Sequence, residues 1–420
     1  MSGNGVRTLQ TNKRRMAIVG TGHRGAGTWG REVPDLCGDH VKLVGLSDVN
    51  PARLGVVAAR LGVGGPAVNT DLDAMLAVCR PHTLLVATRD DTHADIIVHA
   101  LESGIDVVTE KPMATTAEDC RRILDAEART GRRVDVAFNY RFAPTSRKIR
   151  EILASGRIGT VTSCDFHWYL DTVHGADYFR RWHAYKRFSG SLFVHKATHH
   201  FDLLNWWIDG DPVRVFAQGA LRKYGAAGPF RGVRCKGCEH STECDFYLDI
   251  SKSEWLDALY EAPSVDDGYV RDACVFREDI DIYDTMTAAI HYDNGVQVSY
   301  SLNAYMPIEG YHLAFNGTEG RVEVRMFEKQ AFEAPEDRDE ILVLGVNRSV
   351  ERIVVEHGPG GHFGGDPLLH KSLFVPEFDD PMNQRAGARA GAMSVLTGVA
   401  ATRSAETGEP VEIAPLLLGR

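Results

Sequence analysis

The chain has 420 residues, of which 44% are hydrophobic, a formal net charge of −10 and a pI of about 5.9. This length exceeds what one hydrophobic core usually supports, so we expect two globular domains. The acidic balance argues against nucleic acid as a partner but permits a local cationic pocket for one small anion. No apolar run is long enough to span a membrane and the polar start lacks the apolar region of a secretory signal, so we predict a cytoplasmic protein without membrane contact.

The first predicted elements are typical of a dinucleotide-binding domain. The short apolar run 16–19 leads into a glycine pattern with the spacing G-x-G-x-x-G, which predicts a strand, a tight turn and a helix. The second glycine lets the backbone approach a pyrophosphate, which then faces the helix N-terminus. We therefore predict cofactor contacts from the residues of this turn: Gly20, Gly22, His23, Arg24 and Gly25.

The second predicted strand, over 41–48, ends in Asp48. A carboxylate at this point can accept hydrogen bonds from both ribose hydroxyls of NAD and would repel the 2′-phosphate of NADP. No arginine follows Asp48 directly, because Arg53 already lies in the helix that we expect to start at Pro51. NAD is therefore the predicted cofactor. The alternative is that Asp48 only caps this helix.

Apolar strands and helical patterns then alternate as far as residue 140. Strands are predicted over 82–88, 106–110 and 133–138, and helices over 92–103 and 116–130. The last helix is preceded by Thr115-x-x-Glu118, the pattern of a capping box. This βαβ alternation predicts a doubly wound parallel sheet, a Rossmann domain over 13–140.

The tripeptide Glu110-Lys111-Pro112 follows one of these strands at its carboxyl end, where parallel sheets bind their ligands. Pro112 ends the strand and turns Lys111 toward the crevice. A lysine beside a nicotinamide can hold a substrate hydroxyl and take its proton as hydride leaves the carbon. A solvent-facing Glu–Lys pair in a loop is the alternative.

The order of these motifs, continued by Asn139-Tyr-Arg141, resembles the glucose-fructose oxidoreductase/inositol dehydrogenase family, Gfo/Idh/MocA, over almost the whole chain. The resemblance implies an α/β fold with an NAD-binding domain and a C-terminal α/β domain, here over 141–385, whose large, mainly antiparallel sheet often serves as an oligomer surface. We then expect a homo-oligomer, and a C-terminal helix and tail over 386–420 that pack back on the body. The resemblance also implies sugar or cyclitol substrates that react at a secondary carbinol. It adds expected cofactor contacts from Thr88, His93, Glu110, Lys111, Asn139 and Arg141.

The histidine-rich segment SGSLFVHKATHHFD, residues 189–202, matches the catalytic helix of this family. Family members usually carry an aspartate there and, four residues later, a histidine, which join the lysine around the reacting hydroxyl. His199 matches that histidine, and His195 stands where the aspartate is expected. The resemblance thus implies that Lys111, His199 and His195 are catalytic, with a proton relay changed by the imidazole at position 195.

The same segment permits a metal site as an alternative. On one continuous helix, His195, His199 and Asp202 would share a face, and two imidazoles with a carboxylate can bind zinc. Imidazoles suit proton transfer at neutral pH equally well, and the family site needs no metal, so acid/base chemistry is the preferred interpretation. Lys196 is either a second active-site cation or a surface residue. Packing in the core is expected for His200 and for the apolar residues after it, namely Phe201, Leu203, Leu204, Trp206 and Trp207.

Two further segments could border the substrate. An aromatic and cationic run over 168–187 could stack on a pyranose and hold an anionic substituent, although such runs also form core. The glycine-rich loop 360–366, with a histidine and an aspartate, either borders the site or is a plain turn. The predicted substrate contacts are Tyr178, Arg181, Trp182, Lys186 and Lys196.

Four cysteines, Cys235, Cys238, Cys244 and Cys274, lie in a predicted insert over 232–275. Thiolates at these spacings can bind a structural Zn²⁺. The alternatives are packed reduced thiols and a redox pair. The other cysteines, Cys37, Cys79, Cys120 and Cys164, lie in apolar segments and are expected in the core.

The predicted function is hydride transfer between a secondary hydroxyl of a pyranose or glycoside, at C3, and NAD. In some relatives of this family the oxidation is transient and a glycoside is cleaved without net redox change, so an NAD-dependent glycosidase, for example one acting on sulfoquinovosides, is the alternative. A sensor that binds NAD and a sugar without catalysis is the third hypothesis. The presence of both Lys111 and His199 argues against that sensor.

Overall fold

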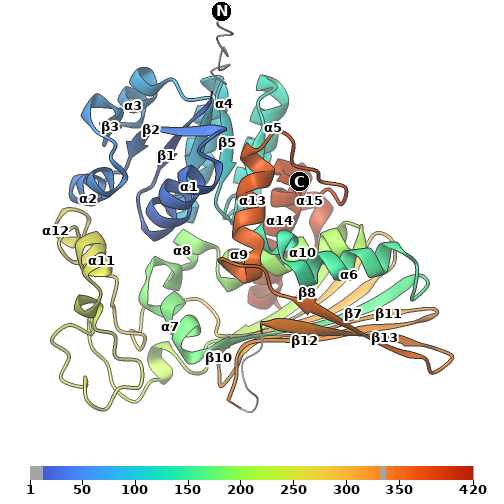
Figure 1. Cartoon of the computed structure of the whole chain (residues 1–420). Coiled ribbons are helices and arrows are strands. Elements are labelled where there is room, and N and C mark those ends of the chain that lie inside the picture. Colours follow the sequence, from blue (N-terminus) through green and yellow to red (C-terminus); the bar gives the residue numbers. More distant parts are fainter. Residues whose placement is uncertain (1–12, 332–336, 420) are drawn as a thin grey trace, which may run out of the picture.

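The computed structural model describes residues 13–331 and 337–419. Two sheets dominate the fold, and helices lie between them (Figure 1). Within the described residues, no helix has the length and apolar character needed to cross a membrane.

The N-terminal sheet has seven strands in the order β15-β6-β5-β4-β1-β2-β3. All neighbours are parallel except β15, which pairs antiparallel with β6. Its strands are β1 (Arg14–Val19), β2 (Val41–Ser47), β3 (Val68–Asn69), β4 (Thr83–Val86), β5 (Asp106–Thr109), β6 (Val134–Val136) and β15 (Ala386–Gly387). The predicted doubly wound sheet is confirmed, and the strand order changes direction between β1 and β4, where such sheets bind ligands.

The helices of this domain connect successive strands. The first connection begins as a π-helix, η1, and continues as α1. Helix α5 is capped by Thr116, whose hydroxyl accepts a hydrogen bond from the Asp119 amide (3.1 Å), so the cap predicted at Thr115 and Glu118 is wrong by one residue. The helices are η1 (Arg24–Glu32), α1 (Val33–Cys37), α2 (Pro51–Leu61), α3 (Leu72–Cys79), α4 (His93–Glu102) and α5 (Ala117–Thr130).

The second sheet has nine strands in the order β14-β13-β12-β11-β7-β10-β9-β8-β16 and is antiparallel except for the pair β7–β10. This confirms the predicted large, mainly antiparallel sheet. Its strands are β7 (Val161–Asp171), β8 (Pro212–Ala220), β9 (Thr285–Tyr292), β10 (Gln297–Met306), β11 (Glu309–Gly317), β12 (Gly320–Lys329), β13 (Arg338–Gly345), β14 (Val350–Glu356) and β16 (Val411–Glu412).

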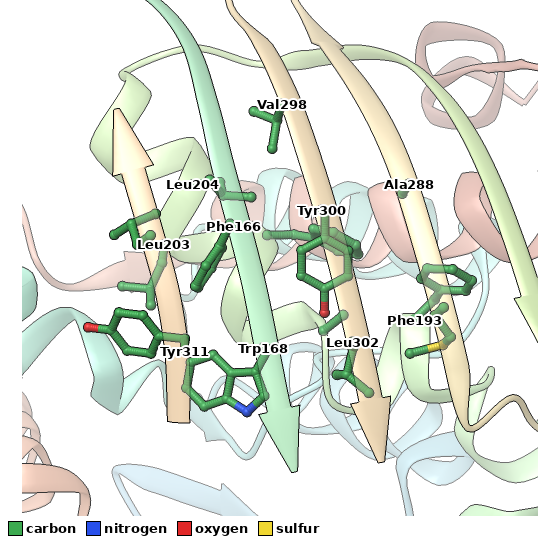
Figure 2. Packing of buried hydrophobic residues seen from close by; sticks show 14 of the residues in the cluster. Phe166, Trp168, Phe193, Leu203, Leu204, Ala288, Val298, Tyr300, Leu302 and Tyr311 are labelled. Carbon is green, nitrogen blue, oxygen red and sulfur yellow. The ribbon is translucent and has the colours of Figure 1, made fainter. Parts of the chain in front are cut away.

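Side chains alternate along these strands, so that one face of the sheet forms the second core. Figure 2 shows Phe166 and Trp168 of β7 and Tyr300 of β10 on this face, together with Leu203 and Leu204. The predicted core residues after His200 all belong to this cluster, which confirms that prediction.

The helices of the second half lie against this sheet or join it to the first domain. Helix α14 does both, because Ala392 packs in the N-terminal core and Leu396 in the core of the large sheet. The helices are α6 (Pro144–Ala154), α7 (Thr172–Arg180), α8 (Lys186–Ser189), α9 (Leu192–His195), α10 (Thr198–Ile208), α11 (Glu254–Leu256), α12 (Ser264–Asp267), α13 (Gly365–Phe374), α14 (Ala388–Thr407) and α15 (Ile413–Leu418). Short 3₁₀ or π turns are η2 (Gly65–Ala67), η3 (Asp90–Thr92), η4 (Asn139–Phe142), η5 (Trp182–Ala184), η6 (Gly225–Ala227), η7 (Ile250–Lys252), η8 (Asp257–Glu261) and η9 (His362–Gly364).

Candidate active site

The glycine-rich turn after β1 is packed so closely that side chains do not fit at two of its glycines. Gly20 has a φ of +89°, and a Cβ there would lie 2.5 Å from the carbonyl carbon of Ala87. A Cβ at Gly25 would lie 1.9 Å from the carbonyl oxygen of Gly20. A Cβ at Gly22 would clash with nothing and would be in ordinary contact, at 3.6 Å, with the hydroxyl of Tyr260. The turn therefore fits the pyrophosphate cradle that its sequence predicts.

Asp48 is fixed at the end of β2 by the backbone around it. Its Oδ2 accepts hydrogen bonds from the Thr21 amide (2.7 Å) and hydroxyl (3.0 Å), and its Oδ1 accepts one from the Asn50 amide (2.9 Å). Asn50 caps helix α2, so the alternative role of Asp48 as the cap is wrong. Arg53 lies closer to Asp48 than the sequence predicted. The first turn of α2 brings its Nη1 to 3.4 Å from Asp48 Oδ1, although Arg53 lies within the helix.

Lys111 lies at the carboxyl end of β5, where the bond to Pro112 is cis. Its Nζ donates a hydrogen bond to the backbone carbonyl of His195 (3.3 Å). Burial lowers the pKa of Lys111 to about 8, against the opposing effect of Asp90. Glu110 is buried and Lys111 is half-buried, so the alternative of a solvent-facing pair is wrong. Lys111 can therefore exist as a neutral amine, a proton acceptor, near neutral pH.

Asp90, which the sequence did not single out, forms a buried pair with His195. It belongs to the η3 turn after β4, and its Oδ2 lies 2.5 Å from His195 Nδ1. Burial raises the pKa of Asp90 and lowers that of His195, and the positive charge of Lys111 adds to the effect on His195. We assign the proton to Nδ1 from this hydrogen bond. No described residue hydrogen-bonds to Nε2, and Nε2 is not among the fully buried atoms, so it can accept a proton.

His199 lies in the first turn of α10 among aromatic rings. Its ring meets Tyr140 edge to face, with centroids 4.9 Å apart, and Tyr140 makes a similar contact with His362 at 5.2 Å. Burial lowers the pKa of His199, and Lys111 adds to this effect. His362 is paired with Asp366 (2.8 Å). The structure thus brings the glycine-rich loop 360–366 to the side of His199.

The metal alternative on the histidine-rich segment is wrong because the helix is interrupted. Residues 196 and 197 separate α9 from α10, so His195 and His199 do not continue one helical face. Asp202 is occupied by Arg141, which donates hydrogen bonds from Nε and Nη2 to its two oxygens, each 2.7 Å long. Throughout residues 13–331 and 337–419, no group of three or more His, Cys, Asp or Glu is placed to hold a metal ion.

The cysteines of the insert likewise form no group placed to hold a metal ion among the described residues. Cys235, Cys238, Cys244 and Cys274 line one small pocket beside Arg180 and are free thiols, which agrees with the alternative of packed reduced cysteines and gives the zinc prediction no support. The four cysteines expected in the core are all buried, and that prediction is confirmed.

Three predicted substrate residues lie around this histidine and lysine cluster. A fourth, Arg181, is near enough for its charge to lower the pKa of His195, and the fifth lies elsewhere. Lys196 is 3% exposed, with Nζ 5.0 Å from the Trp168 ring centre, so the surface alternative is wrong. The rings of Tyr178 and Trp182 lie 5.5 and 5.6 Å from that of His195. Lys186 is instead held by Glu406 (2.7 Å), on α14. Arg181 donates a hydrogen bond to Tyr269 of the insert (3.2 Å).

Several predicted cofactor residues are engaged within the protein, so their contacts to NAD stay predictions. Arg24 pairs with Glu110 (2.7 Å), and Thr88 shares a hydrogen bond with Thr92 (2.7 Å). Asn139 donates to Asp366 (2.6 Å). His93 Nδ1 lies 2.9 Å from the carbonyl oxygen of Pro112 and so braces the turn that carries Lys111.

The Arg141–Asp202 pair is expected to contribute strongly to stability. Both side chains are buried, with 6% and 1% exposed, so removing one leaves the other charge buried without a partner. We expect Arg141→Ala to lower the free energy of unfolding by about 3–5 kcal/mol in denaturant titrations. The matched control is Arg129→Ala, which breaks an exposed pair with Glu102 and should cost at most about 1 kcal/mol. Equal losses in the two variants would contradict this.

The chain matches two adjoining family profiles that together cover most of its length. Residues 14–138 match the oxidoreductase family, NAD-binding Rossmann fold, of Gfo/Idh/MocA, and residues 150–413 match the C-terminal alpha/beta domain of the same family. The chain is 42% identical to the protein YteT of Bacillus subtilis (strain 168) over 394 residues, which cover 89% of this chain and 91% of that protein.

More distant similarities agree with these matches. Inositol 2-dehydrogenase of Rhizobium meliloti (strain 1021) is 31% identical over 200 residues, 46% of this chain and 56% of that enzyme. The structure of the WlbA dehydrogenase from Bordetella pertussis, in complex with NADH and UDP-GlcNAcA, shares the fold with a TM-score of 0.66 at 20% identity, over 95% of this chain and 97% of that one. The predicted resemblance is therefore confirmed, and the chain belongs to the Gfo/Idh/MocA family of oxidoreductases with an NAD-binding Rossmann domain.

Proposed function

We propose that the protein transfers hydride between NAD and a secondary hydroxyl of a sugar, a glycoside or a cyclitol, with C3 of a pyranose as the reacting position. The observation that carries this proposal is the half-buried Lys111 at the ligand-binding edge of the parallel sheet, with a pKa lowered to about 8. The family membership and the inositol dehydrogenase among the relatives support a polyhydroxylated substrate.

Lys111 and the histidines near it have different roles in the proposed reaction. The neutral Lys111 amine takes the hydroxyl proton as the carbinol C–H bond breaks and the C=O bond forms. When bound, NAD⁺ accepts the hydride, so alcohol and NAD⁺ give ketone, NADH and one proton. His195, whose Nδ1–H is held by Asp90, offers Nε2 as the next acceptor for the proton that leaves the site. His199 borders the same space and can hold a neighbouring hydroxyl by hydrogen bonding.

Net NADH formation tests this proposal. The protein is mixed with NAD⁺ and a panel of cyclitols, free pyranoses and pyranosides, and the nicotinamide absorbance is followed together with the ketone product. We expect one NADH per ketone for at least one member of the panel. A panel that gives neither ketone nor glycoside cleavage, with NAD⁺ and the sugar both bound, would overturn the enzyme hypothesis in favour of the sensor.

Redox-neutral glycoside cleavage stays the alternative, and the same experiment separates it. The paired Asp90 and His195 supply an acid/base group beyond Lys111, as a reaction with an elimination and a water addition would need. Its signature is release of the aglycone without NADH accumulation.

The homo-oligomer and the cytoplasmic location that the sequence predicts stay predictions.

A further inference from the structure

The cysteine-bearing insert reaches across to the edge of the Rossmann domain. In Figure 1 its helices α11 and α12, drawn in yellow, lie beside α2. Asn50 Nδ2 donates a hydrogen bond to the carbonyl of Pro263 (2.7 Å). Arg53 donates one to the carbonyl of Leu259 (3.2 Å) and pairs with Asp267 (2.7 Å). The insert is thus attached at the end of β2, beside Asp48, the residue predicted to bind the ribose of the cofactor.

One insert side chain lies directly on the glycine-rich turn. The hydroxyl of Tyr260 accepts a hydrogen bond from the His23 amide (3.0 Å) and would lie 3.6 Å from a Cβ at Gly22. Leu259 and Tyr260 pack in the same core cluster as Leu46 and Leu54, so the tyrosine is held in place by the Rossmann domain itself. The backbone amides of this turn are the groups that bind a dinucleotide diphosphate.

Two arginines add positive charge at the same place. Arg181 and Arg271 both pair with Asp177, at 3.2 and 2.5 Å, so two guanidinium groups share one carboxylate. Arg271 lies 5.9 Å from the ring centre of Tyr260. Burial lowers the pKa of His23, and the charges of Arg181 and Arg271 contribute to that shift, as expected for neighbours of the turn. A net positive charge therefore lies beside the His23 amide, which donates its hydrogen bond to Tyr260.

We propose that the insert completes the cofactor site, with Tyr260, Arg181 and Arg271 binding the diphosphate of NAD. A diphosphate brings two negative charges to a place where guanidinium groups exceed carboxylates, and guanidinium is well suited to phosphate oxygens. The phenol can donate its O–H to the same anion to which the turn offers its amides. Arg181, predicted from the sequence as a substrate residue, becomes a cofactor residue. This proposal rests on NAD binding and is independent of the reaction proposed above.

Calorimetric titration without turnover tests the proposal. ADP-ribose, which carries the diphosphate, and adenosine, which does not, are titrated into the nucleotide-free full-length protein and its variants. We expect Arg271→Gln to weaken ADP-ribose binding at least about tenfold and to leave adenosine binding within about twofold, because only the diphosphate accepts a hydrogen bond from the guanidinium. Arg181→Gln should behave in the same way, and Tyr260→Phe should weaken ADP-ribose binding by a smaller factor.

The matched control is Arg231→Gln, an arginine directly before the insert that pairs with Glu278 on the surface and should bind ADP-ribose like the wild type. Normal adenosine affinity in each variant also reports an intact fold. The proposal is overturned if Arg181→Gln and Arg271→Gln bind ADP-ribose normally, as they would if these arginines bound only an anionic substrate. It is also overturned if Tyr260→Phe binds ADP-ribose more tightly, because the phenol would then only obstruct the turn.

Discussion

Replacing Lys111 by alanine is expected to lower kcat about 10³-fold while the NAD affinity changes little. The amine is the group that accepts the hydroxyl proton, and a positioned acid or base of this kind contributes roughly 10²–10⁴ in rate. The substitution also removes one hydrogen bond from the fold, the one that Nζ donates to the His195 carbonyl. Steady-state kinetics with the substrate found in the NADH assay, together with calorimetric NAD titration, separates catalysis from binding.

The pH dependence of kcat/KM is a second test of Lys111 as the base. A lysine with its pKa lowered to about 8 is protonated below that value and neutral above it. Alcohol oxidation needs the neutral amine, so kcat/KM should rise with pH and level off above about 8. Lys111→Arg keeps the charge but cannot lose its proton, so it should be as inactive as alanine and should lack this rise. Full activity of the arginine variant would contradict the role as base. Lys371→Ala, at an exposed position of α13, is the control.

The Rossmann domain could be predicted nearly strand by strand because its signals are local. Glycine spacing, apolar runs and turn residues act within a few positions of the chain. The capping residue was missed by one position because Thr115 and Thr116 stand side by side, each with an acidic residue three positions on, and only the backbone decides which hydroxyl faces the first turn.

The candidate site was predicted in part, because its decisive contacts join distant segments. The lysine and the two histidines follow from motifs, but the pairing of His195 with Asp90 depends on how α9 docks against the end of β4. A signal was present in Asp90 and Asp91, two carboxylates in the turn that follows a parallel strand. The helix break at 196–197 has no glycine or proline to mark it. The hydrogen bond between His23 and Tyr260 lies beyond any local pattern.

Asp90→Asn is expected to reduce kcat about 100-fold with little change in KM or in NAD affinity. The asparagine carbonyl can still accept the Nδ1–H of His195, so the ring keeps its orientation. The variant lacks the negative charge that stabilises the imidazolium when Nε2 takes a proton, which is costly in a buried site. The pKa of His195 should therefore fall further. The charge of Asp90 also raises the pKa of Lys111, so its removal should move the acidic limb of the kcat–pH profile to lower pH.

A structural role alone would lower kcat without moving that limb, so the shift is the deciding measurement. Asp91→Asn is the matched control, since Asp91 pairs with the neighbouring Arg89 (2.6 Å) outside the His195 contact, and its profile should match the wild type. In this family the carboxylate is expected at position 195. His195→Asp alone would set two carboxylates together, which disfavours their ionisation. Adding Asp90→Asn removes that repulsion, so the double variant should be more active than His195→Asp. The same activity in both would mean that Asp90 does not act through position 195.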